Sequence, residues 1–162
     1  MKLSGCHEMK NKLFIALLII AGFWGFTSVS GKSDPCVNTY VDFGSLDHSK
    51  QIIGCVPVNG EEIALDILAK SGLSLEGTKK YGLKVVCRVN KLPSLAVEPC
   101  ETMPPEDAYW AVIVKRHSRI PDPLSIQNKW NWADKGVSEV YLKAGDSIGL
   151  VYTEKGKIKW PS

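Results

Sequence analysis

The sequence predicts a single α+β domain in which one helix packs on a mixed β-sheet and disulfides staple the fold. Three observations predict this class. Apolar and polar residues alternate with the period of a strand in several segments, and one segment has the spacing of an amphipathic helix. Four cysteines follow an apolar N-terminal run, an even number that favours disulfides. No internal repeat or low-complexity tract divides the 162 residues.

The first 31 residues have the pattern of a secretory signal peptide. Lys10 and Lys12 precede an apolar run over 13–26, and small residues follow at Ser30 and Gly31. The run has roughly 14 residues, fewer than the ~20 that a membrane-spanning helix needs. Its length therefore favours cleavage near Gly31 over permanent anchoring, and it predicts a secreted or cell-surface protein.

Cleavage would leave residues 32–162 as one domain of ordinary size. Basic residues would fall from 20 to 17 and acidic residues from 17 to 16, which leaves a formal charge of +1. This near-neutral balance provides no electrostatic basis for nucleic-acid binding. Cys6 precedes the apolar run instead of following it, so we do not interpret it as a lipoprotein anchor.

The mature chain is predicted to begin with a β-hairpin. Residues 37–43 alternate between apolar and polar, 44–49 are rich in turn formers, and 51–58 resume an extended apolar pattern. A strand pair folded about this turn brings Cys36 opposite Cys55, within the ~5.5 Å Cα separation that a disulfide needs. This geometry pairs Cys36 with Cys55.

A helix of about three turns is expected next. Asn59 is predicted to cap its start, and Gly72 is placed to end it. Asp66 and Lys70 have the i,i+4 spacing of an exposed ion pair. The expected apolar stripe, which must lie on the sheet, consists of Ile63, Ala64, Ile67, Leu68 and Ser71.

The rest of the chain predicts strands joined by polar loops. Strands are expected over 83–89, 110–114, 137–142 and 148–153, with the last two joined across 144–146. A proline-rich loop over 91–105 contains Cys100, and pairing the remaining cysteines, Cys87 with Cys100, would tie this loop to the strand it leaves. A hairpin, a helix and about four further strands in this order fit a β-grasp.

Zinc binding is the alternative role for the four cysteines. The chain has no Cys-x-x-Cys pair, and the spacings of 19, 32 and 13 residues place no two cysteines on a single turn. Export to an oxidising compartment favours disulfides. We therefore expect no metal site.

Short motifs occur in order along the mature chain. They are Tyr40-Val41-Asp42-Phe43-Gly44, Gly54-Cys55-Val56-Pro57, Ala64-Leu65, Ser71-Gly72-Leu73, Val86-Cys87-Arg88-Val89, Glu98-Pro99-Cys100, Pro104-Pro105, Ala108-Tyr109-Trp110, Trp130-Asn131-Trp132-Ala133, Gly136 and Gly145-Asp146-Ser147-Ile148-Gly149. In order and spacing they resemble the transcobalamin-like C-terminal domain family, particularly its secreted actinobacterial members. The family is a β-grasp-like module of animal cobalamin carriers and of secreted bacterial proteins.

The resemblance implies capture of a corrinoid, such as cobalamin, or of another small molecule, beside a membrane transporter component. At two places this sequence lacks an aromatic residue that the family commonly has. Ala111, Val112 and Ile113 stand where the family often has a second aromatic residue, and Gly149-Leu150 stands where it commonly has Gly-Trp. The large helical domain that closes over cobalamin in the animal carriers has no counterpart in this sequence.

Four aromatic residues are the candidate ligand-binding residues: Tyr109, Trp110, Trp130 and Trp132. Trp130 and Trp132 lie in a polar, turn-rich segment, where exposed rings suit a flat or hydrophobic ligand. The alternative is a structural role. Trp110 alternates with Val112 and Val114 as a core residue of a strand would, and one of Trp130 and Trp132 could be core.

Other polar groups indicate no catalytic site. The basic run 115–119 could meet an anionic surface, although a solvated strand end explains it better. His48 and His117 lie in polar loops without a recognisable nucleophile motif. The carboxylate pairs 61–62 and 106–107 are explained by a helix N-terminus and by loop solvation. We therefore expect no enzyme.

Two functions follow as expectations. The first is a non-enzymatic extracellular module that captures a small molecule for an uptake system. The second is a protein–protein or cell-wall interaction module that docks a partner by a strand edge or a loop. In both, contact with a membrane would come only through an uncleaved N-terminal segment.

Overall fold

The structure is a computed structural model that describes residues 35–49, 51–117 and 128–161. The chain divides into two compact units, Met1–Lys32 and Ser33–Ser162, and the described residues belong to the second. The predicted signal peptide and the end of the basic run lie outside the described residues. No helix among the described residues combines the length and the apolar character needed to cross a membrane.

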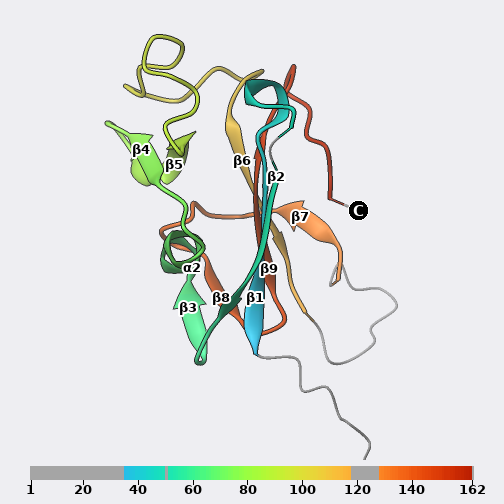
Figure 1. The fold of residues 1–162 in the computed structure, drawn as a ribbon. Coiled ribbons are helices and arrows are strands. Elements are labelled where there is room, and N and C mark those ends of the chain that lie inside the picture. Colours follow the sequence, from blue (N-terminus) through green and yellow to red (C-terminus); the bar gives the residue numbers. More distant parts are fainter. Residues whose placement is uncertain (1–34, 50, 118–127, 162) are drawn as a thin grey trace, which may run out of the picture. The chain divides into compact units, whose positions relative to one another are not determined.

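The main sheet has five strands in the order β2-β1-β9-β6-β7 (Figure 1). The strands are β1 (Cys36–Asp42), β2 (Gln51–Pro57), β6 (Trp110–Lys115), β7 (Trp130–Trp132) and β9 (Ser147–Tyr152). The central pair, β1 and β9, is parallel, and every other neighbouring pair is antiparallel. The first and the last strands of the domain therefore lie side by side.

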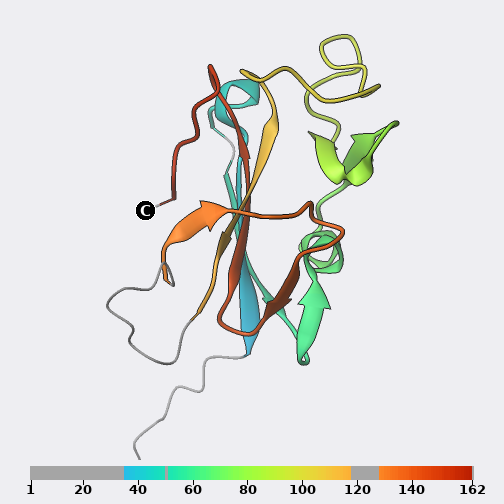
Figure 2. The ribbon, with the colours of Figure 1, turned by 180° about the vertical axis from the view of Figure 1, so that it is seen from behind.

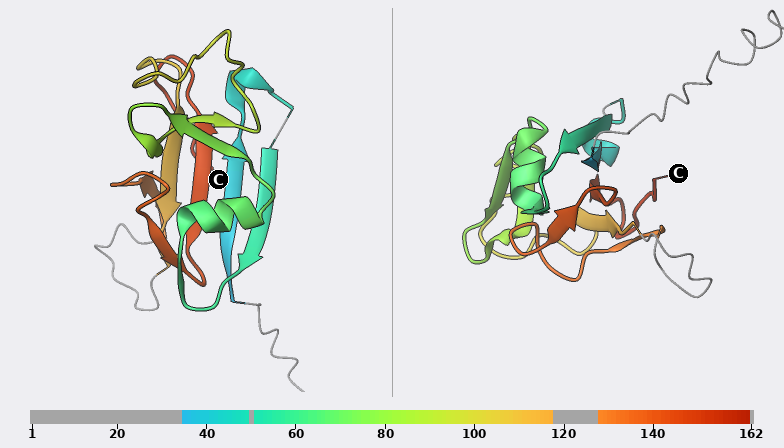
Figure 3. Two further views of the ribbon diagram at one scale, coloured as in Figure 1. Left: turned by 90° about the vertical axis from the view of Figure 1, so that its left-hand side faces the viewer. Right: turned by 90° about the horizontal axis from the view of Figure 1, so that it is seen from below.

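The remaining elements are η1 (Gly44–Leu46), β3 (Glu61–Ile63), α2 (Ala64–Lys70), β4 (Leu75–Thr78), β5 (Gly82–Val89) and β8 (Tyr141–Lys143). Two further two-stranded sheets form, because β3 pairs with β8 and β4 pairs with β5. The left panel of Figure 3 shows α2 and the β4–β5 sheet in front of one face of the main sheet. We call this the core face and the opposite one the outer face.

Strand alternation builds the core as expected. In β1, Val37, Thr39 and Val41 are buried on the core face, beside Ile148 and Leu150 of β9. From α2 the predicted stripe contributes Ala64, Ile67 and Leu68, all fully buried. Each such Ile or Leu contributes about 1.5–3 kcal/mol through the apolar surface it removes from water. The chain is thus a mixed α+β domain with one α-helix among the described residues.

The start of the helix differs from the prediction. Residues 61–63 form β3, and α2 begins at Ala64 with no side-chain cap, so Asn59 does not cap it. The backbone N–H groups of Ala64 and Leu65 donate instead to the carbonyls of Val140 and Val137, at 2.8 and 3.0 Å. Distant carbonyls thereby satisfy the donors that a cap residue would otherwise serve.

The end of the helix is as predicted. Gly72 has φ of +83°, the left-handed conformation that favours glycine. The N–H of Gly72 donates to the Ala69 carbonyl at 2.9 Å, and that of Leu73 donates to the Leu68 carbonyl at 3.2 Å. These two bonds are the Schellman arrangement. The expected Asp66–Lys70 pair does not form, because the Lys70 ammonium contacts Glu62 of β3 and holds the pKa of that carboxyl below its usual range.

The last strands pair differently from the expectation. The strand expected over 137–142 is confined to β8, which pairs with β3, whereas β9 pairs with β1 and β6. Residues 137 and 140 supply the carbonyls that begin the helix. Two strands, β4 and β7, were not predicted, because the first contains Gly77 and the second has only three residues.

Both predicted disulfides are present. Cys36–Cys55 has a Cα separation of 5.6 Å, and Cys87–Cys100 one of 5.8 Å. The hairpin register places Cys36 opposite Pro57 and Cys55 opposite Asn38. The first disulfide therefore joins residues that are diagonal neighbours on one face of the hairpin, not directly opposed ones.

Candidate functional site

Three of the four predicted aromatic residues line one cavity of about 770 Å³: Tyr109, Trp110 and Trp132. Its walls come from four segments, 84–86, 103–106, 109–112 and 132–136. We call it the edge cavity, because it lies along the edge of β6. Its volume falls within the range of about 300–1,000 Å³ that is usual for small-molecule sites.

The cavity exists because β7 is short. β7 pairs only with Ile113–Lys115 of β6, and after it the N–H of Ala133 donates to the Val112 carbonyl at 2.9 Å. Among the described strands, none pairs with Trp110 and Ala111 on this side. The first residues of β6 therefore present an open backbone edge to the cavity.

Gly136 closes the cavity against β5. A Cβ at this position would lie 2.2 Å from the carbonyl oxygen of Lys84, a distance that no side chain can occupy. The 132–136 segment therefore crosses the backbone of β5 in direct contact. An ion pair between Lys84 and Glu139, at 2.8 Å, lies beside this crossing.

Trp110 belongs to the hydrophobic core as well as to the cavity wall. Only 4 % of its surface is exposed. Its ring meets Phe43 edge-on with the centroids 5.2 Å apart, and Tyr152 at 5.4 Å. The indole N–H donates to the Leu92 carbonyl at 3.1 Å. Trp110 is therefore mainly a core residue, which was the alternative to its role in ligand binding.

Tyr109 and Trp132 are better placed to touch a ligand. The backbone of Tyr109 is anchored by Thr153, whose hydroxyl accepts from the Tyr109 N–H at 2.9 Å and whose own N–H donates to the Tyr109 carbonyl at 2.8 Å. Trp132 is 49 % exposed, on β7 and not on a loop, with its ring 5.9 Å edge-on from Trp160. Trp130 does not join them, because its ring lies near Tyr40 and lines a different cavity.

Most of the remaining wall is apolar. Met103, Pro104 and Pro105 form one side. They were not among the predicted site residues, because they are neither aromatic nor titratable, although the Pro104-Pro105 motif was part of the resemblance. Charged side chains of both signs also line the cavity: Lys84, Glu106, Asp134 and Lys135. The lining suits a molecule with a large apolar surface and a few polar groups.

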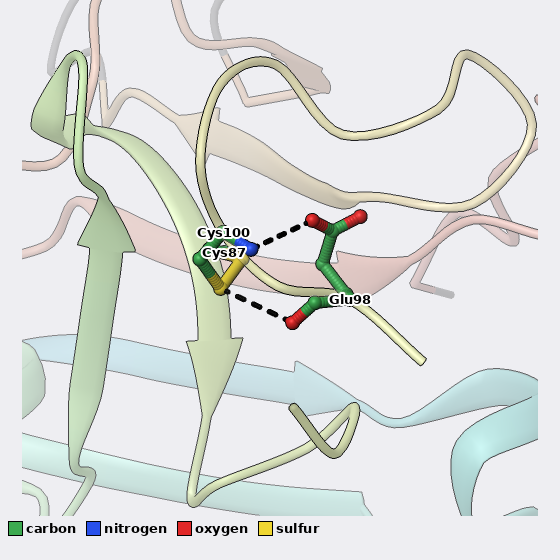
Figure 4. A group of neighbouring side chains, drawn as sticks. All are labelled: Cys87, Glu98 and Cys100. Atoms are coloured by element: carbon green, nitrogen blue, oxygen red, sulfur yellow. Dashed lines mark hydrogen bonds between the residues drawn. A yellow bond between two sulfur atoms is a disulfide. The ribbon is translucent and has the colours of Figure 1, made fainter. Parts of the chain in front are cut away.

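The Cys87–Cys100 disulfide fastens two of these walls together. Cys87 follows the 84–86 wall on β5, and Cys100 precedes the 103–106 wall. Figure 4 shows the disulfide beside Glu98, whose carboxylate accepts from the Cys100 N–H at 2.9 Å. The three residues have the ligand types of a metal site within 4.8 Å of one another, but the sulfurs are joined and offer no thiolate.

The candidate catalytic groups are dispersed among the described residues. The His48 imidazole is exposed, and its Nδ1 lies 4.0 Å from a carboxylate oxygen of Glu154. The His117 ring packs over Gly145, while its backbone N–H donates to Asp146 at 2.8 Å. The buried Asp146 carboxylate also accepts from Arg116 at 3.2 Å, so it holds the end of β6 to the turn before β9.

Comparisons of the chain with protein-family models, with curated proteins and with solved structures found no match.

Proposed function

We propose that the chain is a non-enzymatic binding module that captures a small molecule in the edge cavity, one with a flat surface for stacking and polar groups at its periphery. The observation that carries this proposal is that the neighbouring rings of Tyr109 and Trp110 and the sequence-distant ring of Trp132 line one cavity of about 770 Å³. Rings and prolines provide stacking surface, and the open edge of β6 provides backbone donors and acceptors.

The strand order supports a finer fold assignment, which is also a proposal. Counted within the main sheet alone, its strands lie in the order second, first, fifth, third and fourth, with the first and fifth parallel. This is the order of a β-grasp. A β-grasp with the motifs described above is consistent with a transcobalamin-like domain, which makes a corrinoid the first ligand to test and a transporter component the first partner.

We place this capture outside the cell or at its surface. Two disulfides are typical of an oxidising environment, and disulfides are rare in the cytosol. The N-terminal apolar run provides the route of export in this proposal.

Titration with three probes tests the proposal. Cyanocobalamin, dicyanocobinamide and 1-anilinonaphthalene-8-sulfonate are added to the purified full chain, and binding is followed by tryptophan fluorescence and calorimetry. We expect saturable binding at micromolar concentrations for at least one corrinoid. Trp132→Ala and Tyr109→Ala should each weaken it about tenfold, as expected for the loss of one stacking ring.

Trp130→Ala is the matched control, because Trp130 is also a tryptophan of β7 but does not line the edge cavity. It should leave corrinoid affinity unchanged. If only the naphthalene probe binds, the edge cavity remains a binding site for small molecules, but a corrinoid is excluded as its ligand. No saturable binding of any probe at high micromolar concentrations would contradict the proposal.

A protein partner is the second candidate, and a separate observation favours it. Leu95 and Val97 of the proline-rich loop are 62 % and 70 % exposed, more than is usual for large apolar side chains. Co-purification with one surface protein that is lost in Leu95→Asp, but retained in Tyr109→Ala, would favour this reading.

A further inference from the structure

A second cavity of about 500 Å³ lies on the outer face of the main sheet, separate from the edge cavity. Rings from three separate segments line it: Tyr40 of β1, Trp130 of β7 and Trp160 near the C-terminal end. The register places Tyr40 beside Ile53 and Gly149, on the side of the sheet away from α2. We call it the outer-face cavity.

The rings of this cavity are held in place before any ligand arrives. The Tyr40 hydroxyl donates to Asp42 at 3.2 Å, and the Trp130 ring lies 6.2 Å from the Tyr40 ring. A Cβ on Gly149 would lie 2.7 Å from Ile113 and 3.4 Å from the Trp130 ring. The absence of a side chain at Gly149 therefore lets Trp130 lie close to the sheet. Because the Trp130 ring is already held, fixing it on ligand binding costs little conformational entropy.

The third ring comes from the chain that follows β9. Glu154 and Lys157 exchange two backbone hydrogen bonds, at 3.0 and 2.9 Å, and the chain then runs back and ends near β7 (Figures 1 and 2). Trp160 is held there by its edge-on contact with Trp132, and 43 % of its surface stays exposed. Trp130 and Trp160 thus line one cavity from different segments.

The charge of the lining has one sign. Lys115 and Lys159 line the cavity, and none of the described residues that line it carries a carboxylate. The neighbouring carboxylate of Asp42 already accepts hydrogen bonds from Tyr40, Gln51 and the backbone N–H of Gly44. The two ammonium groups therefore favour an anionic ligand.

The chemistry of the whole lining matches a sugar better than a flat apolar molecule. A sugar ring has an apolar C–H face that packs on an aromatic ring, and hydroxyls that bond to amides such as those of Asn38 and Gln51, which both line the cavity. We propose that the outer-face cavity binds an acidic glycan, with its sugar rings against Trp130 and Trp160 and its carboxylates at Lys115 and Lys159.

Calorimetry with a matched pair of probes tests this site. Tetragalacturonate and its methyl ester have the same sugar rings and hydroxyls, but only the first carries carboxylates. We expect the acid to bind the full chain at least about tenfold more tightly than the ester. Its affinity should fall about tenfold as salt rises from about 0.05 to 0.5 M, because exposed ion pairs are screened.

Variants separate this site from the edge cavity. Trp130→Ala, and the double variant Lys115→Gln with Lys159→Gln, should each weaken tetragalacturonate binding about tenfold or more. Trp130→Phe should keep most of the affinity and shows that the protein stays folded. Lys135→Gln is the charge-matched control, because Lys135 lines only the edge cavity of the two.

The proposal would be overturned by equal affinity for the acid and the ester, or by unchanged affinity in Trp130→Ala. It would also be overturned if neither tetragalacturonate nor a hyaluronan hexasaccharide bound at about 10 mM, a concentration at which even weak binding is detected. The site stands independently of the proposed function. Tyr109→Ala should weaken corrinoid capture about tenfold without changing the glycan titration, so failure of one leaves the other measurable.

Discussion

The edge cavity and the outer-face cavity are built in different ways. The edge cavity is enclosed by four segments, of which 84–86 and 110–112 belong to β5 and β6 whereas 103–106 and 133–136 are loops, and a disulfide and a glycine contact hold the segments together. Most of the outer-face cavity rests on neighbouring strands of one sheet, where the register alone places the side chains together. A site that depends partly on loops and a site that rests mostly on one sheet should therefore respond differently to the loss of a single constraint.

The largest difference should follow removal of the Cys87–Cys100 disulfide. We expect Cys87→Ser with Cys100→Ser to lower the free energy of unfolding by about 2–5 kcal/mol. Corrinoid binding should be lost, because the disulfide fastens the 84–86 and 103–106 walls. Thermal unfolding and the fluorescence titration measure the two effects.

The matched control is Cys36→Ser with Cys55→Ser, which removes the other disulfide. It should cost a similar free energy of unfolding yet leave corrinoid binding intact below the unfolding temperature. Intact corrinoid binding without Cys87–Cys100 would show that the walls of the edge cavity do not depend on this disulfide.

A methyl group at Gly136 should have the next largest effect. In Gly136→Ala the Cβ would meet the Lys84 carbonyl oxygen at 2.2 Å, and backbone atoms on both sides must move. We expect a loss of about 2–3 kcal/mol in unfolding free energy, at the upper end for overpacking. Corrinoid binding should weaken while tetragalacturonate binding is unchanged, and unfolding by denaturant with both titrations measures this.

Gly149→Ala should show the reverse selectivity at a smaller cost. Its Cβ would meet the Ile113 and Trp130 side chains, which can move more easily than backbone. We expect a loss of about 1–2 kcal/mol, together with weaker tetragalacturonate binding and unchanged corrinoid binding. Equal effects of Gly136→Ala and Gly149→Ala on both ligands would mean that the two cavities are not separate sites.

The smallest effect concerns the hydroxyl of Tyr40. Burial, with help from the neighbouring charge of Asp42, raises the pKa of Tyr40 to about 12. The folded protein thus prefers the neutral phenol, so this contribution to stability is complete below pH 10 and is lost as the pH rises to about 12.

A spectrophotometric titration that compares the protein with Tyr40→Phe identifies this group. In Asp42→Asn the pKa of Tyr40 should fall towards its ordinary value, because both the charge and its hydrogen bond to the phenol change. An unchanged pKa in that variant would mean that burial alone sets it.

Local patterns were sufficient for the parts of the fold that depend on neighbours in sequence. Alternation over 37–43 and a turn-rich segment after it predicted the first hairpin, and the hairpin in turn predicted Cys36–Cys55. Gly72 was predicted to end the helix because a helix commonly ends at a residue in the left-handed conformation, and glycine adopts that conformation most easily.

The candidate site was predicted only in part. Aromatic composition singled out Tyr109, Trp110 and Trp132, which line one cavity, but it grouped Trp130 with them. Trp130 and Trp132 lie on the same face of a three-residue strand, and the chain beyond each of them decides which cavity it lines. No periodicity in 130–132 carries that information.

The sequence by itself therefore determined the hairpin, the two disulfides, the apolar face of the helix and its C-terminal stop. Tertiary structure decided where the helix begins, because carbonyls of 137 and 140 replace the cap expected at Asn59. It also decided that β9 lies between β1 and β6, and that an edge of β6 stays open. These features depend on backbone groups of segments far apart in the chain. Every residue type except proline carries the same backbone donor and acceptor, so side-chain patterns do not encode these contacts.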